Sequence, residues 1–149
     1  MFLCHARPLR SEESNRMSNR LTYGFTQTFQ GSPEDIEARV RVALQAEGFG
    51  VLTEIDVAAT LKKKLDVDFR PYRILGACNP QLAHQALTEE HDIGLLLPCN
   101  VVVYAGDAPG TTVVSILDPA QQLAVSGRAD LNGLANEVRA RMERVLAAV

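Results

Sequence analysis

Residues 72–80 read Tyr-Arg-Ile-Leu-Gly-Ala-Cys-Asn-Pro, and residues 94–101 read Gly-Leu-Leu-Leu-Pro-Cys-Asn-Val. Each block places a Cys-Asn pair beside a proline; the two pairs are Cys78-Asn79 and Cys99-Asn100. The first block alternates like a strand as far as Cys78. Asn79-Pro80 is then typical of a helix start, because Asn is a good N-cap and Pro is tolerated in the first turn. The blocks therefore predict a strand and a helix start in the first, and a second strand that begins at Cys99.

The chain before these blocks predicts two strands, each followed by a helix. Residues 23–29 read as a strand, and Ser32-Pro33 opens a helix that ends before Gly48, which can take a left-handed C-cap conformation. Residues 51–57 alternate with period two, which predicts a half-buried strand with Val51, Ile55 and Val57 on its inner face. A short helix over 58–65 follows.

The chain after Asn79 predicts a helix over 80–90, then an apolar run over 95–98 that reads as buried irregular chain or a short turn. Strands over 99–104 and 111–117 form a β-hairpin, which Asp118-Pro119 ends. Asp130 caps a last amphipathic helix. This order lacks regular βαβ alternation at its end, which predicts an α+β fold with an antiparallel or mixed sheet and helices on one face.

The totals indicate one domain, over 21–149, after a polar tail at 1–20. Met17 is a plausible start, so residues 1–16 are hypothesised to be an upstream extension, and Cys4-His5 has no partner at ligand spacing. A net charge of −3 argues against nucleic-acid binding, and no apolar run approaches the ~20 residues of a membrane span. Three cysteines, an odd count, fit a reducing compartment, so we expect a cytoplasmic protein.

Cys78 and Cys99 are the residues most suggestive of chemistry. A helix start beside Cys78 predicts a stabilised thiolate, because thiolates are favoured at helix N-termini. If the two strand ends meet, the thiols could pair, share a soft metal or act as nucleophile and resolver; they could equally pack as small hydrophobes. His84 and His91 share a helix stripe, but the Cys and His spacings match no established ligand pattern, so no metal or cofactor is predicted.

With these motifs identified, the chain resembles domain-of-unknown-function family 302 over about residues 20–149. The resemblance rests on the two Cys-Asn blocks, on Ala83-His84 and Ala86-Leu87, and on the strand from Val113 to Pro119. It implies a TATA-binding-protein-like β-α-β(4)-α fold with a curved sheet, often in a homodimer. It implies no activity and no catalytic residue.

Three functions stay open at this point. The first is binding of a small polar ligand, or action through thiols, at a site formed by Cys78, Asn79, Cys99 and Asn100 with His84 at its edge. The second is a homodimeric structural or interaction module without chemistry. The third is a thiol-redox or soft-metal-binding protein. Whether the protein is an enzyme is not decided by the sequence, which lacks the common hydrolase, kinase and dinucleotide-binding motifs.

Overall fold

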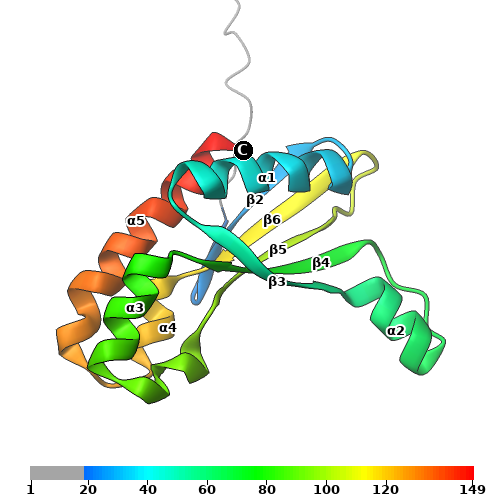
Figure 1. Cartoon of the computed structure of the whole chain (residues 1–149). Helices are drawn as coiled ribbons and strands as arrows, with labels where there is room; N and C mark the ends of the chain where they lie inside the picture. Colours follow the sequence, from blue (N-terminus) through cyan, green and yellow to red (C-terminus); the bar gives the residue numbers. More distant parts are fainter. Residues whose placement is uncertain (1–18) are drawn as a thin grey trace, which may run out of the picture.

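The structure is a computed structural model and describes residues 19–149. The hypothesised extension and the Cys4-His5 pair lie outside the described residues. One antiparallel sheet runs through the molecule in the order β1-β2-β6-β5-β4-β3 (Figure 1). Its strands are β1 (Asn19–Leu21), β2 (Gly24–Gln30), β3 (Gly50–Asp56), β4 (Tyr72–Cys78), β5 (Cys99–Ala105) and β6 (Thr111–Leu117).

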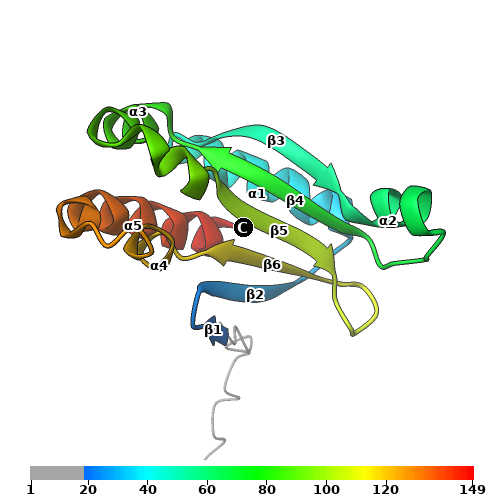
Figure 2. The ribbon, with the colours of Figure 1, turned by 90° about the horizontal axis from the view of Figure 1, so that it is seen from below.

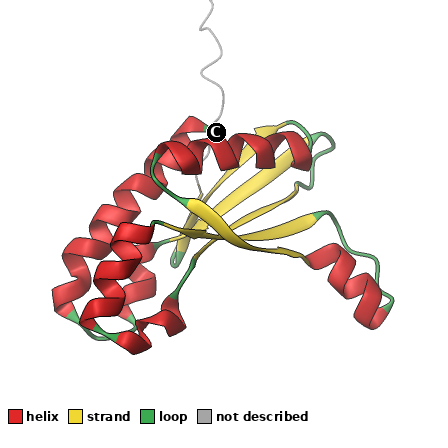
Figure 3. Ribbon diagram, viewed as in Figure 1, coloured by secondary structure: helices red, strands yellow, loops and turns green. Residues whose placement is uncertain are grey.

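The helices gather on one side and at one end of this sheet, except for one that projects from the opposite end (Figure 3). They are α1 (Pro33–Ala46), α2 (Val57–Leu65), α3 (Pro80–Glu89), α4 (Pro119–Ala124) and α5 (Asn132–Ala148), with 3-10 turns η1 (His91–Leu96) and η2 (Ala129–Leu131). The main elements follow the order β-α-β(4)-α, so the predicted α+β fold is confirmed, and the sheet is antiparallel throughout. None of these helices is long and apolar enough to cross a membrane.

The main core lies between the sheet and the pair α1 and α5. Buried side chains alternate along the central strands, as in Leu75 and Ala77 of β4 or Val101 and Val103 of β5. The helices cover them with the stripes that helical periodicity predicted, including Ile36, Val40 and Leu44 from α1 and Met142, Val145 and Leu146 from α5. The other face of the sheet carries no helix across its central strands (Figure 2).

A second, smaller hydrophobic cluster lies beyond the end of β4 and β5. Its buried members come from α3, η1, α4, η2 and the start of α5: Ala86, Ile93, Leu123, Leu131, Leu134 and Ala135. Leu82 packs against both clusters. The second cluster, at the α3 end of the molecule, therefore contacts the main core through Leu82.

The strand predicted over 51–57 is present, but the prediction that one of its faces is half-buried was wrong. The register shifts between Val51 and Thr53, so a bulge breaks the alternation, and β3 is an edge strand. Ile55 is 49% exposed. The strand also ends one residue early, because the Asp56 side chain accepts a hydrogen bond from the backbone N–H of Ala59 and caps α2, which begins at Val57. No residue of α2 is buried, and Figure 1 shows this helix projecting away from the sheet.

Two errors concern the chain after β6. Asp118-Pro119 does not merely end the hairpin: the Asp118 side chain accepts from the N–H of Ala120 and caps α4, a helix that the sequence reading missed. Asp130 does not cap the last helix, which begins at Asn132 without a side-chain cap. The Asp130 carboxylate instead binds the guanidinium of Arg128.

Two further boundaries differ from expectation. The 95–98 run was predicted to be buried irregular chain or a short turn. Its first two residues end the 3-10 turn η1, which leaves Leu95 88% exposed, while Leu96 and Leu97 pack against the second cluster. At the other end, Asn19 and Arg20, predicted to belong to the tail, pair with β2 as part of β1.

Candidate functional site

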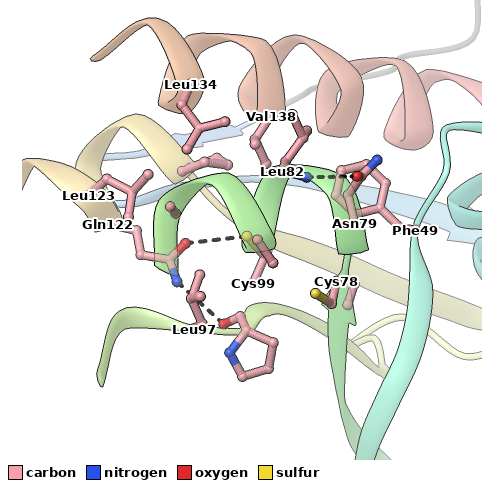
Figure 4. Close-up of a pocket in the computed structure, with 15 residues that line it drawn as sticks. Phe49, Cys78, Asn79, Leu82, Leu97, Cys99, Gln122, Leu123, Leu134 and Val138 are labelled. Carbon is pink, nitrogen blue, oxygen red and sulfur yellow. Dashed lines mark hydrogen bonds between the residues drawn. The ribbon is translucent and has the colours of Figure 1, made fainter. Parts of the chain in front are cut away.

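The two sequence blocks meet at a small pocket on the helix-covered side, where β4 and β5 approach α3, α4 and α5 (Figure 4). We call it the thiol pocket. Its cavity volume is about 40 Å³, and its apolar walls include Phe49, Leu82, Ala83, Ala86, Leu97, Leu123, Leu134 and Val138. The polar residues that reach it are Cys78, Asn79, Cys99 and Gln122. The pocket thus lies at the joint between the two hydrophobic clusters.

The strand register brings the two cysteines together. Cys99 is the partner of Ala77 across β4 and β5, and Cys78 is the next and last residue of β4. Both thiols are free, and Cys99 is 8% exposed while Cys78 is half-buried. The Cys99 thiol lies 3.4 Å from Oε1 of Gln122, to which it donates (Figure 4). The two strand ends therefore meet, which is the condition on which any joint role of the two thiols depends.

The pKa of Cys78 is shifted in the direction opposite to the one expected from the helix start. Burial raises the pKa of Cys99 to about 11, with a smaller contribution from the neighbouring Cys78, and burial also raises the pKa of Cys78. The helix start does not offset this effect, because the first turn of α3 directs the N–H of Leu82 to Asn79 and not to the thiol. Both cysteines are neutral at pH 7, which disfavours a nucleophilic or redox role, since the thiolate is the reactive form.

Asn79 has a structural role at the edge of the pocket. Its Oδ1 accepts a hydrogen bond from the Leu82 N–H at 3.2 Å, which confirms the predicted N-cap of α3. Its amide nitrogen packs against Gly48, where an added Cβ would lie 2.9 Å from Nδ2. Gly48 has a φ of 84°, so this close approach and the left-handed backbone both favour glycine there.

The structure does not bring Asn100 into the same site. Successive strand residues point to opposite faces, so Asn100 follows Cys99 onto the uncovered face of the sheet. There it lines a separate hollow with Tyr72 and Tyr104. The expectation that both Asn amides line one site is therefore not met.

The histidines also lie outside the thiol pocket. His84 and His91 are both exposed. Within residues 19–149 no three His, Cys, Asp or Glu side chains are grouped so that they could hold a metal ion. The geometry gives no support to the soft-metal alternative.

Sequence reasoning missed Gln122, the residue of α4 that organises the pocket. Its Nε2 donates to the backbone carbonyls of Leu96 and Pro98, and its Oε1 accepts from Cys99, so it fixes the chain leading into β5 (Figure 4). The signal was available in Asp118-Pro119, which repeats the cap-proline pattern of Asn79-Pro80 and predicts a helix that would carry Gln122.

Gly76 completes the fit of the two blocks on the opposite side of β4. A Cβ at Gly76 would lie 2.1 Å from Oγ1 of Thr53 and 2.8 Å from Cγ of Pro98. Only a residue without a side chain lets β3 and the Pro98 ring approach β4 so closely. The glycine of the first block and the proline of the second therefore pack against each other.

Comparison with known proteins agrees with this architecture. The family model described as "Domain of unknown function DUF302" matches residues 25–149. The crystal structure of an uncharacterised conserved DUF302 protein from Bacillus stearothermophilus is similar to this chain, with 30% sequence identity and a TM-score of 0.79. The match covers 86% of this chain and 98% of that one. A search of the curated proteins finds no match.

Proposed function

Since the chain belongs to the DUF302 family, whose description assigns no activity, we propose from the geometry that it is a non-catalytic domain that binds a small, uncharged, largely apolar molecule in the thiol pocket. The observation that carries this proposal is the convergence of both sequence blocks on a pocket with apolar walls, where burial raises the pKa of both thiols. The polar ligand expected from the sequence is replaced by an apolar one because the walls are almost entirely hydrocarbon.

The polar groups of the pocket define what the ligand meets. Gln122 and Cys99 already satisfy each other, and Asn79 is engaged in capping α3. Within residues 19–149 the Cys78 thiol makes no hydrogen bond, so it is the group available to a ligand atom. A protonated thiol is a weak donor and a soft, polarisable surface, suited to an uncharged partner.

The volume limits the size of the ligand. A cavity of about 40 Å³ is well below the ~150 Å³ that an engineered apolar cavity uses to hold benzene. The pocket as described therefore accepts a molecule of a few heavy atoms. A larger ligand requires α3 to move away from α5, along the joint between the two hydrophobic clusters.

Xenon tests this proposal, because it is an apolar probe that occupies small dry cavities. Amide chemical shifts of the ¹⁵N-labelled chain are measured under xenon pressure, and we expect saturable changes confined to α3, α4 and the start of β5. Ala83→Leu fills the pocket mouth from a half-buried position and should abolish them, whereas Ala140→Leu, on the exposed side of α5, should not. Absence of saturable shifts, or equal shifts in Ala83→Leu, would contradict the proposal.

A second candidate, a structural or interaction module, is favoured by a different observation. Most of the motif residues already have a packing or capping role: Asn79 caps α3, Gly76 admits Pro98, and the Cys99 thiol is hydrogen-bonded. Under this candidate the blocks build the fold, and function lies on another surface. A variant that no longer binds xenon but still binds its partner would favour the interaction module over the ligand-binding pocket.

A further inference from the structure

The three tyrosines of the chain, Tyr23, Tyr72 and Tyr104, line one hollow on the uncovered face of the sheet, away from α1 (Figure 2). We call it the tyrosine hollow. Its tyrosines come from three separate elements: the β1–β2 turn, β4 and β5. Tyr72 and Tyr104 are register partners, and their rings stack with centroids 5.1 Å apart and planes 10° from parallel. Burial raises the pKa of Tyr72, and the phenols of Tyr104 and Tyr23 add to the rise, as expected for hydroxyl groups that share one space.

The β1–β2 turn fixes the backbone of Tyr23 while leaving its ring accessible. The Tyr23 carbonyl accepts a hydrogen bond from the N–H of Asp118 at 2.9 Å. The next residue, Gly24, lies so close to β6 that an added Cβ would be 2.6 Å from the carbonyl oxygen of Ile116. The Tyr23 side chain is nevertheless 62% exposed. A ring held in place by its backbone is therefore free to contact a ligand in the hollow.

The polar side chains of the tyrosine hollow are neutral, and most of them have no partner within residues 19–149. Ser115 is the exception, because its hydroxyl donates to Oγ1 of Thr26 at 2.7 Å. The three phenol hydroxyls and the exposed Asn100 carboxamide make no hydrogen bond to the described part of the chain. A phenol can both donate and accept, and a carboxamide offers two N–H donors and one oxygen acceptor. The hollow thus presents several unused, uncharged hydrogen-bonding groups.

The size and charge of the hollow limit what it can hold. Its volume of about 370 Å³ lies near the lower end of the ~300–1,000 Å³ typical of small-molecule sites. None of the residues that line it is charged. An ion that entered would lose its water without gaining an opposite charge, which is costly. Aromatic walls favour a ring-shaped molecule, because aromatic pairs attract each other beyond the effect of their buried area.

From this convergence we propose that the tyrosine hollow is a second ligand site, which binds an uncharged aromatic compound that carries an amide or hydroxyl group. The ring of the ligand packs against the tyrosine rings, and its polar substituent exchanges hydrogen bonds with the free phenols and the Asn100 carboxamide. The site does not depend on the thiol pocket, which lies on the helix-covered side of the same strands and holds only about 40 Å³. It gives Asn100 a role separate from that of Cys99, its neighbour in the second sequence block.

Benzamide, benzoate and benzamidine test this proposal, because they are similar in shape but neutral, negative and positive at pH 7. Amide chemical shifts of the ¹⁵N-labelled full chain are followed as each probe is added. We expect benzamide to give saturable shifts, in the millimolar range, in β5, β6 and the β1–β2 turn. Each charged analogue should bind at least about tenfold more weakly, because the hollow offers no opposite charge. Cyclohexanecarboxamide, which lacks the aromatic ring, should also bind more weakly than benzamide.

Two variants test the residues of the site. Asn100→Ala removes the free carboxamide and Tyr104→Leu removes one aromatic wall, and each should weaken benzamide binding by about tenfold. Asn136→Ala makes the same change as Asn100→Ala at an exposed position of α5 and should leave binding intact. The amide spectrum of each variant shows whether it folds, and Asn100→Ala, at an exposed position, decides the matter if Tyr104→Leu does not fold.

Absence of saturable shifts with benzamide, equal affinity for the three analogues, or unchanged binding in either folded variant would overturn the proposal. Shifts of the same amides that grow with protein concentration alone would assign the hollow to a second copy of the chain, and would overturn it too. Ala83→Leu, which should abolish xenon binding in the thiol pocket, should leave benzamide binding unchanged. Failure of the tyrosine hollow and failure of the thiol pocket are therefore distinguishable.

Discussion

Gly76→Ala is the substitution that most directly probes how the two sequence blocks fit together. The new methyl group would lie 2.1 Å from Oγ1 of Thr53 and 2.8 Å from Cγ of Pro98, both shorter than a carbon contact tolerates. Overpacking of this kind costs about 1–3 kcal/mol, and two simultaneous clashes place the expectation near the upper end, at about 2–3 kcal/mol. Thr53→Ala removes the closer clash and should recover about 1 kcal/mol in the double variant, since contacting residues couple by such amounts.

Urea unfolding followed by far-ultraviolet circular dichroism measures these free energies, because the chain contains no tryptophan. With a slope of about 2 kcal/mol/M, Gly76→Ala should lower the midpoint by about 1 M at unchanged slope. Gly50→Ala is the matched control on the neighbouring strand: nothing lies within 4 Å of its added Cβ, and it should be neutral or stabilise by up to about 1 kcal/mol. Equal midpoints for the two glycine variants, or no recovery with Thr53→Ala, would refute the close-approach explanation.

Four further results are expected. Asn79→Ala should cost about 1 kcal/mol of unfolding free energy through loss of the α3 cap, and Asn79→Ser should restore most of it, as urea unfolding will show. In a Cys4→Ser chain, Cys99 should resist alkylation until the pH approaches about 11, whereas the urea-unfolded chain reacts near pH 8.5; equal rates would contradict its burial. Because this folded pKa is raised, stability should be complete below about pH 9 and fall as the pH rises through about 11. Met142→Ala, at a fully buried position, should cost about 2–5 kcal/mol.

The sequence predicts the elements well where a local signal has a single physical meaning. Asn79-Pro80 and Ser32-Pro33 start helices because cap and proline both act within one turn. The prediction fails where a distant or competing group decides the outcome. Asp130 was expected to cap the last helix, but its carboxylate pairs with Arg128. A bulge after Val51 shifts the register of β3, so the residues after it do not keep the faces that strict alternation predicts.

The site shows the same division between local and non-local causes. The blocks predict that Cys78 ends one strand and Cys99 begins another, but the pairing of those strands, which brings the thiols close, comes only from the structure. The direction of the thiol pKa shifts could not be predicted either, because burial comes from α3 and α5, which close over the pocket only in the folded chain. Gln122 was missed for a related reason. It lies 23 residues after Cys99 in the sequence, and its hydrogen bond to that thiol forms only when α4 packs against β5.

The two Cys-Asn pairs look equivalent in the sequence, yet their phase within the strands gives them different roles. Cys78-Asn79 straddles the end of β4, so the asparagine is free to cap a helix. Cys99-Asn100 lies inside β5, so its members must point to opposite faces. A slip of one residue between β4 and β5 would exchange Cys99 for Asn100 in the pocket and place a thiol on the uncovered face of the sheet. The packing of Pro98 against Gly76 opposes that slip, because any side chain in place of the glycine would meet the proline ring. The glycine and proline of the blocks therefore keep Cys99 in the thiol pocket and Asn100 on the uncovered face.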